Sequence, residues 1–279
     1  MNPRPDPPSE FAIECRIAVD AAEEAGALLR SRCRQEYAVR PKGDRGDVVT
    51  DLDLLAERLV LGRLREHFPL DRILAEEAGL LEGERPSRTW LVDPLDGSNN
   101  VVIGLPAYVV GIALCVDRRP VLGVVHDPVT LRTWRALSGC GAYGPHGRLS
   151  APVRPLPSSG PVLAWTQGHA VPRDDPAAGA LKSALESGAR RLLQLWAPLL
   201  TWSMLARGDI DGFVGYRPEE IDLPAGSLLA AEAGLDVRAL DGGGFSHRIG
   251  LPDTERGFVA GRPEVVPYLL DLVAQARTG

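Results

Sequence analysis

The stretch LVDPLDGSNN, residues 91–100, constrains the fold of this chain more than any other part of the sequence. An apolar run ends there in Asp93 and Asp96, and burying two carboxylates side by side is costly because each loses hydration and repels the other. Pro94 cannot donate to a strand ladder and disfavours helix at the residue before it. We therefore expect a strand that ends in a turn and aims both carboxylates at one point.

This turn offers a set of oxygen ligands. The carboxylates of Asp93 and Asp96 and the carbonyl of Leu95 suit a hard divalent cation such as Mg²⁺, which would also remove the repulsion. Gly97 has no side chain, so a ligand can approach the backbone closely. Ser98 is the first residue of an expected helix, and the free backbone amides at a helix start favour an anion. A bound cation and free backbone amides would both attract a phosphate group, so the stretch predicts a phosphate-binding site. The alternative interpretation is a surface turn, because turns prefer these residue types.

Further carboxylates lie on both sides of this turn in the sequence. Glu76 and Glu77 end the apolar run ILAEEAG, and Asp222 opens IDLPAG. A helix N-cap followed by proline is the simpler interpretation of Asp222 taken alone. Thr50 and Asp53 in TDLD have the spacing of a capping box. Each of these signals is weak separately.

Hydrophobic spacing predicts two helices in the N-terminal part of the chain, over residues 11–33 and 50–68, joined by a loop that contains proline and glycines. Residues 90–140 consist of short β-rich runs and predict a largely antiparallel sheet. The later stretch RRLLQLWAPLLTWSMLARGD is predicted to be helical, with Trp196 and Trp202 on its apolar face.

A seam rich in proline and small residues, SAPVRPLPSSGP, divides the chain into two halves. We expect a disordered N-terminus at 1–10, an α+β half at 11–152 and an α/β half at 153–279, in which strands and helices alternate. The first half would carry most of the candidate ligands, and the second would carry Asp222.

Composition narrows the possible partners. The net charge of −6 and the scattered basic residues argue against a nucleic-acid partner. No apolar run approaches the roughly 20 residues that span a bilayer, and the polar, proline-rich start does not resemble a signal peptide. We therefore expect no membrane partner and a cytoplasmic location. The four cysteines lack C-x-x-C spacing and nearby histidines, which argues against a zinc site and a disulfide framework.

Four motifs in order resemble the inositol monophosphatase family. The chain carries DVVTDLD, AEEAG, WLVDPLDGSNNVVIGLP and IDLPAGSLLAAEAG, where that family has D-x-V-T-x-x-D, G-E-E, W-x-x-D-P-I-D-G-T-x-N-F and W-D-x-A-A-G-x-x-x-x-E-A-G. The resemblance covers roughly residues 11–275. It implies a layered αβαβα sandwich of mixed α+β and α/β character, usually a homodimer, that hydrolyses a small phosphomonoester with Mg²⁺.

The resemblance also implies a set of metal ligands, with two or three Mg²⁺ ions per site. Glu76, Asp93 and the Leu95 carbonyl would hold the first ion. Asp93, Asp96 and Asp222 would hold the second. Such a pair of ions can activate a water and neutralise the leaving alkoxide.

Catalytic and phosphate-binding roles follow from the same motifs. Glu76 and Ser98 would position and deprotonate the attacking water, with Asp53 orienting the Ser98 hydroxyl. The amides of Gly97 and Ser98 would receive phosphate oxygens. For Glu77, metal binding through water and a plain solvent-facing role both stay open.

The residues that depart from the family pattern fall in the part of the site that would contact the alcohol portion of the substrate. Gly215 stands where inositol-specific members have a glutamate, seven residues before the last metal aspartate. The family segment R-S-x-G-[ST]-A-A is here LLQLWAPLL, with Trp196, Ala197 and Pro198. We expect Trp196, Gly215 and His169, which follows AWTQG, at the substrate pocket. The substrate would be a sugar, nucleoside or amino-alcohol phosphate rather than an inositol phosphate.

Other functions stay open from the sequence. Fructose-bisphosphate and phosphoadenosine phosphatases belong to the same superfamily, and a catalytically inactive member would be a metabolite-binding or regulatory module. Core packing is the alternative role of Trp196. Because Li⁺ inhibits many members of the resembled family, the resemblance also implies inhibition by Li⁺.

Overall fold

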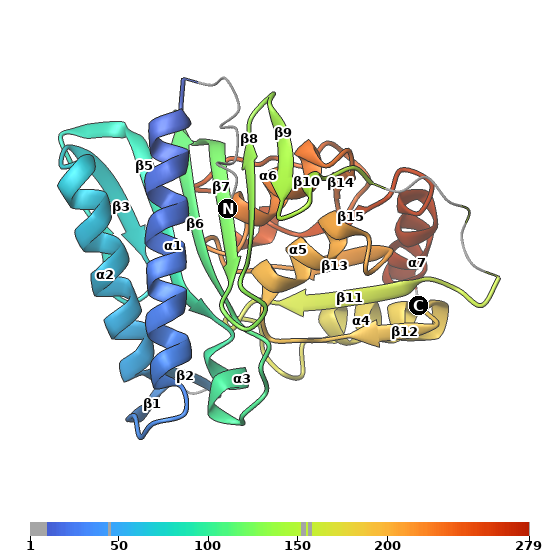
Figure 1. Ribbon diagram of the computed structural model, residues 1–279. Coiled ribbons are helices and arrows are strands. Elements are labelled where there is room, and N and C mark those ends of the chain that lie inside the picture. Colours follow the sequence, from blue (N-terminus) through green and yellow to red (C-terminus); the bar gives the residue numbers. More distant parts are fainter. Residues whose placement is uncertain (1–9, 44–45, 152–154, 156–157, 279) are drawn as a thin grey trace.

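The computed structural model describes residues 10–43, 46–151, 155 and 158–278 of the chain (Figure 1). The expectation for the N-terminus therefore lies outside the described residues except for Glu10, and so does the boundary expected after residue 152.

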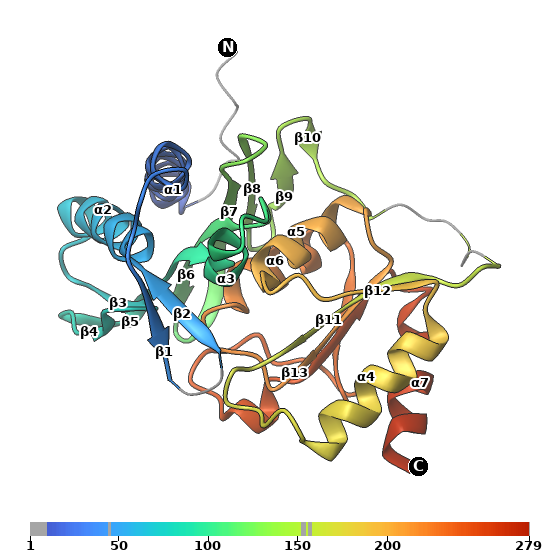
Figure 2. The same cartoon turned by 90° about the horizontal axis from the view of Figure 1, so that it is seen from below.

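Five layers of helices and sheets alternate through the molecule (Figures 1 and 2). Two helices, α1 and α2, cover one face of an eight-stranded sheet. Two more, α5 and α6, pack between its other face and a five-stranded sheet, whose far face is covered by α4 and α7. This is the αβαβα sandwich that the sequence predicts. The helices of these layers are α1 (Ala12–Arg32), α2 (Asp51–His67), α4 (Pro176–Gly188), α5 (Pro198–Arg207), α6 (Pro224–Glu232) and α7 (Val266–Thr278).

The eight-stranded sheet has the order β10-β9-β8-β7-β6-β5-β3-β4. All its neighbours pair antiparallel except β3 and β5, which are parallel. The predicted, largely antiparallel sheet is therefore confirmed. Its strands are β3 (Asp71–Ala75), β4 (Gly79–Leu81), β5 (Arg85–Asp96), β6 (Val109–Val116), β7 (Arg119–Asp127), β8 (Arg132–Leu137), β9 (Gly141–Gly144) and β10 (Gly147–Arg148).

The five-stranded sheet has the order β12-β11-β13-β15-β14. Strand β11 is parallel to both of its neighbours, whereas β15 is antiparallel to β13 and β14. Its strands are β11 (Val162–Gln167), β12 (Arg191–Leu193), β13 (Gly212–Tyr216), β14 (Asp236–Ala239) and β15 (Phe258–Gly261), and a single 3₁₀ turn, η1 (Asp253–Glu255), precedes β15.

Apolar side chains form three cores between these layers. One lies beneath α1 and α2, a second surrounds α5 and α6 between the two sheets, and a third lies beneath α4 and α7. The second core is tight where β7 meets α6: a Cβ at Gly123 would lie 2.7 Å from the carbonyl oxygen of Ala225. Only glycine allows the two backbones to approach so closely. Among the described residues, no helix combines the length and the apolar character needed to cross a membrane.

Two predicted elements are wrong. The expected loop between the first two helices is a hairpin of β1 (Val39–Lys42) and β2 (Asp47–Thr50). The expected helix in RRLLQLWAPLLTWSMLARGD begins only at Pro198, after β12. Proline in a helix interior removes a donor and clashes with the preceding turn, whereas at the first position it fits. Trp196 therefore lies in a loop rather than on a helical face.

Candidate metal and phosphate site

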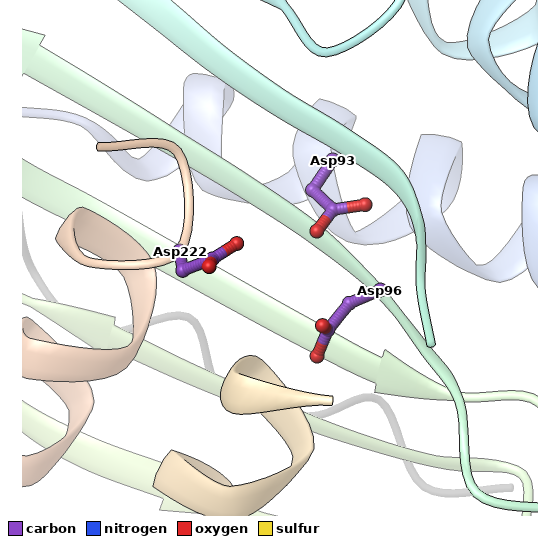
Figure 3. Close-up of side chains that lie close together, drawn as sticks. All are labelled: Asp93, Asp96 and Asp222. Carbon is purple, nitrogen blue, oxygen red and sulfur yellow. The ribbon is translucent and has the colours of Figure 1, made fainter. Parts of the chain in front are cut away.

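Three carboxylates gather where β5 ends, as Figure 3 shows. One ligand oxygen from each of Asp93, Asp96 and Asp222 lies within 4.8 Å of the others. Residues three apart in a regular strand face opposite sides of a sheet. Here three steps along β5, from Asp93 to Asp96, oppose only two along β6, from Gly111 to Val109. This bulge turns both aspartates to the same side, toward Asp222 in the loop before α6.

The electrostatics of the cluster favour a bound cation. Asp93 and Asp96 are only 3% and 5% exposed. Burial, and then the charges of neighbouring carboxylates, raise the pKa of Asp93 and of Asp222 well above the usual range. Burial likewise raises the pKa of Asp96, although two backbone amides oppose the shift. A divalent cation supplies the positive charge that this set of oxygen donors needs. The residues present therefore fit Mg²⁺.

Glu76 lies beside this cluster, and Lys42 of the hairpin holds it. The Lys42 ammonium donates to Glu76 Oε1 at 2.8 Å and to Glu77 Oε1 at 2.7 Å. Burial raises the pKa of Glu76, and Lys42 opposes that shift. Burial lowers the pKa of Lys42, but its two ion pairs outweigh this and raise it overall. Glu77 thus has a defined partner rather than a plain solvent-facing role.

Ser98 and Asp53 form a buried hydrogen-bond chain under the cluster. Ser98 Oγ lies 2.5 Å from Asp53 Oδ1 and 2.9 Å from the Leu95 carbonyl oxygen. The other oxygen, Asp53 Oδ2, accepts from the amide of Thr50 at 2.7 Å and from its hydroxyl at 2.6 Å. The capping box at the start of α2 is present. Asp53 therefore caps the helix with one oxygen and holds Ser98 with the other, and burial raises its pKa.

Two side chains of the 91–100 stretch also hold the second half of the molecule. Asp96 Oδ2 accepts from the amides of Leu199 at 2.7 Å and Leu200 at 3.2 Å, in the first turn of α5. The N-cap of α5, Ala197, has no capping side chain of its own, so Asp96 takes that role from a distant strand. Asn100 Nδ2 donates to the carbonyl oxygen of Leu195 at 2.5 Å.

A cleft of about 1040 Å³ opens over these groups. All the predicted metal, catalytic and phosphate-binding residues except Asp53 line it, as do His169 and Trp196. Asp53 lies beneath Ser98. Gly215, expected at the substrate pocket, is not among the described residues that line the cleft. A Cβ at this position would lie 2.2 Å from Phe258 Cε1, so Phe258 leaves no room for a side chain there. The position offers the alcohol no side chain.

Several lining residues have no counterpart among the sequence predictions. Glu219 and Glu220 closely precede Asp222, and this proximity is a signal that the sequence offers. Asp47 opens the motif DVVTDLD and Gln194 lies in the segment LLQLWAPLL, but neither pattern assigns them to the site. Lys42, Arg173 and Arg256 lie outside the quoted motifs, and no local pattern indicates them.

Comparisons with known proteins agree with this geometry. The profile of the inositol monophosphatase family matches residues 14–275. Nus factor SuhB of Escherichia coli strain K12 is 33% identical over 259 residues, which cover 91% of this chain and 93% of that protein. Inositol-1-monophosphatase of Mycobacterium leprae is 34% identical over 241 residues, 80% of this chain and 82% of that protein. The crystal structure of the extragenic suppressor protein suhB from Bartonella henselae has a TM-score of 0.84 at 25% identity, covering 94% of this chain and 98% of that one.

Proposed function

This chain belongs to the inositol monophosphatase family, and from that premise we propose that it is a Mg²⁺-dependent phosphomonoesterase that acts on a small phosphorylated metabolite. The observation that carries the proposal is the cluster of three carboxylates within 4.8 Å of one another at the floor of a 1040 Å³ cleft. Buried like charges at such distances are costly without a cation, and a cleft of this size accommodates a small ester.

The metal ligands proposed are those that the family motifs indicate. We expect two or three Mg²⁺ ions per site. One would be held by Glu76, Asp93 and the Leu95 carbonyl, and another by Asp93, Asp96 and Asp222. When bound, such ions activate a water and neutralise charge on the phosphate and the leaving alcohol. The buried oxygens of the cluster support this assignment.

The residues of the chain position the reacting groups. Water oxygen bonds to phosphorus, the ester P–O bond breaks, and the alcohol leaves with a proton. Ser98, when it donates to Asp53, keeps its lone pairs available to accept a hydrogen bond from that water. Glu76 is the candidate for the group that takes the water's proton. The amides of Gly97 and Ser98 are proposed to receive phosphate oxygens.

The alcohol preference proposed is for a sugar, nucleoside or amino-alcohol phosphate rather than an inositol phosphate. Gly215 provides no side chain to the alcohol, and the loop before α5 contributes Trp196 and Pro198 to the cleft. A polyhydroxylated ring in such a site leaves desolvated hydroxyls unpaired, at roughly 1–3 kcal/mol each.

The Asp93→Asn variant tests the proposal in a phosphate-release assay with a panel of esters and Mg²⁺. We expect wild-type activity on at least one small ester and a loss of about 10³-fold or more in the variant, because a metal supplies several kcal/mol of transition-state stabilisation. Asp209→Asn, at a solvent-exposed carboxylate beside Arg207, is the matched control and should keep full activity. Near-normal turnover by Asp93→Asn would refute the two-ion assignment.

Relatives named Nus factor SuhB support a second candidate, a function as a Nus factor by a binding or regulatory member of the family. The same screen separates the two candidates. If wild-type protein with Mg²⁺ releases phosphate from none of the esters, the second candidate replaces the first. The net charge of −6 continues to favour a partner other than bare nucleic acid.

We propose further that the protein is a homodimer located in the cytoplasm. Three apolar side chains at the end of α3 (Ser98–Val102) and just after it support the dimer because they are exposed to solvent in the isolated chain. An exposed apolar group of this kind commonly marks a contact surface. These side chains are Val102, Ile103 and Leu105.

A further inference from the structure

Trp196 has an unusual backbone conformation for its residue type. Its φ angle is +52°, in the left-handed region that side chains other than glycine rarely adopt. Conformations of this kind persist only where the surroundings fix them, and they concentrate at ligand-binding sites.

The surroundings of Trp196 fix its backbone from both sides. On one side, Asn100 Nδ2 donates to the carbonyl oxygen of Leu195 at 2.5 Å. On the other, Asp96 Oδ2 accepts from the amide of Leu199 at 2.7 Å. Both anchors belong to the stretch that also carries the candidate metal ligands. Trp196 is therefore placed by the reaction centre itself, and its Cα lies within about 10 Å of the Leu199 amide, three residues away.

The side chain of Trp196 is available to a ligand. It is 56% exposed, whereas Trp90, Trp134, Trp165 and Trp202 are at most 2% exposed. It lines the same cleft as the three carboxylates, so a ligand whose phosphate is held at the carboxylates shares that cleft with the indole. An exposed indole stacks favourably on another planar ring, with a gain beyond that of burial alone.

We propose that Trp196 is a specificity-determining residue that selects phosphomonoesters whose alcohol carries a planar aromatic or heteroaromatic ring close to the phosphate. The indole stacks on that ring while the carboxylate cluster and its cations hold the phosphate. When the ester P–O bond breaks, the alcohol leaves with its ring, and its oxygen takes up a proton. The inference rests on the phosphatase function proposed above and names the substrate class of that site.

Two esters that differ only in planarity test the selection, namely 2-phenylethyl phosphate and 2-cyclohexylethyl phosphate. Their leaving groups are equally reactive primary alcohols, so a difference in kcat/KM reports on contacts with the ring. We expect the wild-type protein to prefer the phenyl ester by roughly two- to twelve-fold, the range that aromatic stacking supports. Trp196→Ala should bring the ratio close to one, and Trp196→Phe should keep most of it. An equal loss on both esters in Trp196→Ala would overturn the proposal.

Acrylamide quenching of tryptophan fluorescence tests binding without turnover. Because Trp196 is the exposed tryptophan of the five, it should account for most of the quenching, and Trp196→Phe should remove that component. With Mg²⁺ present, 3-phenylpropylphosphonate, which cannot be hydrolysed, should shield Trp196 more than 3-cyclohexylpropylphosphonate does. Equal shielding by the two phosphonates, or none, would overturn the proposal.

The two measurements separate this inference from the proposed function. If no ester is hydrolysed but the phenyl compound shields Trp196 selectively, the phosphatase function fails while the selection of planar ligands stands. If Trp196→Ala lowers the oligomeric mass in sedimentation and affects both esters alike, Trp196 is a contact between copies of the chain, and the inference fails.

Discussion

Asp93 shows at the scale of one residue how a reactive site weakens the fold that carries it. Its carboxylate is buried, and the charged groups that act on it are other acids. Burial, together with the charges of Glu76, Asp96 and Asp222, raises its pKa well above the value that it has in an unfolded chain. Ionised Asp93 therefore opposes folding until a cation binds.

The Asp93→Asn variant should consequently be more stable than the wild-type protein when metal is removed. Below the unfolded pKa of the carboxyl, Asp93 is protonated in both states and has no such effect. As the pH rises through the raised folded pKa, ionisation destabilises the wild-type fold but not the variant. In EDTA we expect the variant to have the higher free energy of unfolding near neutral pH, by a difference that shrinks toward pH 4. Urea unfolding at several pH values measures this. A variant less stable than wild type at every pH would show that ionised Asp93 does not weaken the fold.

Inhibition by Li⁺ is a further prediction for the same oxygen ligands. Li⁺ is a hard cation with a single charge, so it can occupy an oxygen site without supplying the charge of Mg²⁺. Millimolar LiCl should lower phosphate release, and KCl at the same ionic strength should not. Full activity in LiCl would indicate ligand geometry unlike that of the resembled family.

At the scale of elements, the turn between β5 and α3 requires glycine at position 97. Gly97 has a φ of +108°, and a Cβ there would lie 2.7 Å from the carbonyl oxygen of Ala107. Gly104, a few residues later, also has a positive φ, of +78°, but a Cβ there would meet nothing within 4 Å. The two positions therefore separate conformational strain from steric clash.

We expect Gly104→Ala to lower the free energy of unfolding by about 1–2 kcal/mol, the strain of a left-handed alanine. Gly97→Ala should cost more, because the backbone of Ala107 must also move, and it should lower phosphate release because Asp96 precedes it directly. Urea denaturation compares the two variants. Equal destabilisation by both substitutions would mean that the backbone at Ala107 can move away from the added methyl group at little cost.

The elements predicted from sequence are those that local spacing determines. The expected helices at 11–33 and 50–68 match α1 and α2 within one residue or two. The hairpin of β1 and β2 has a short and largely exposed first strand, so it carries no alternating apolar signal. Strand β12 exists because Arg191–Leu193 pairs with β11, nearly thirty residues earlier. Pairing of this kind is non-local, and no window of the sequence contains it.

The same distinction applies to the candidate site. The motif that contains Asp93 and Asp96 predicts that both carboxylates share one side. The turn that it predicts at these residues is wrong, because β5 continues through Pro94 to Asp96 and a bulge brings both carboxylates to the same side. The structure adds Asp222 from the loop before α6. By contrast, the hydrogen bond from Lys42 to Glu76 joins residues 34 positions apart in the chain, and that from Asn100 to Leu195 joins residues 95 positions apart. These contacts depend on how the layers stack, which local patterns do not encode.

At the scale of the whole molecule, the candidate ligands come from both halves of the chain. Glu76 follows β3, and Asp93 and Asp96 lie in β5, both strands of the eight-stranded sheet. Asp222 instead precedes α6, a helix that packs between the two sheets. The cleft therefore lies where the two halves meet, and its formation requires both.

Assembly into a homodimer is the prediction that concerns the whole molecule. Ile103 is 65% exposed, in the apolar segment after α3, and Leu131 is similarly exposed, at 59%, in the turn between β7 and β8. Ile103→Asp should convert a dimer to a monomer in sedimentation velocity, because a charge in an apolar contact is costly. Leu131→Asp is the matched control and should leave the mass unchanged. A monomeric wild-type protein would remove the homodimer from the proposal.

The anchors on either side of Trp196 have a consequence for how such proteins diversify. Asn100 and Asp96 hold Leu195 and Leu199 by backbone atoms, so these two contacts do not depend on the side chains between them. Residues 195–198 thus resemble an exchangeable insert with fixed ends. If Trp196 selects the alcohol as proposed, grafting the equivalent segment from another member of the family should transfer that member's preference while every carboxylate stays in place. New substrates can then arise without rebuilding the reaction centre.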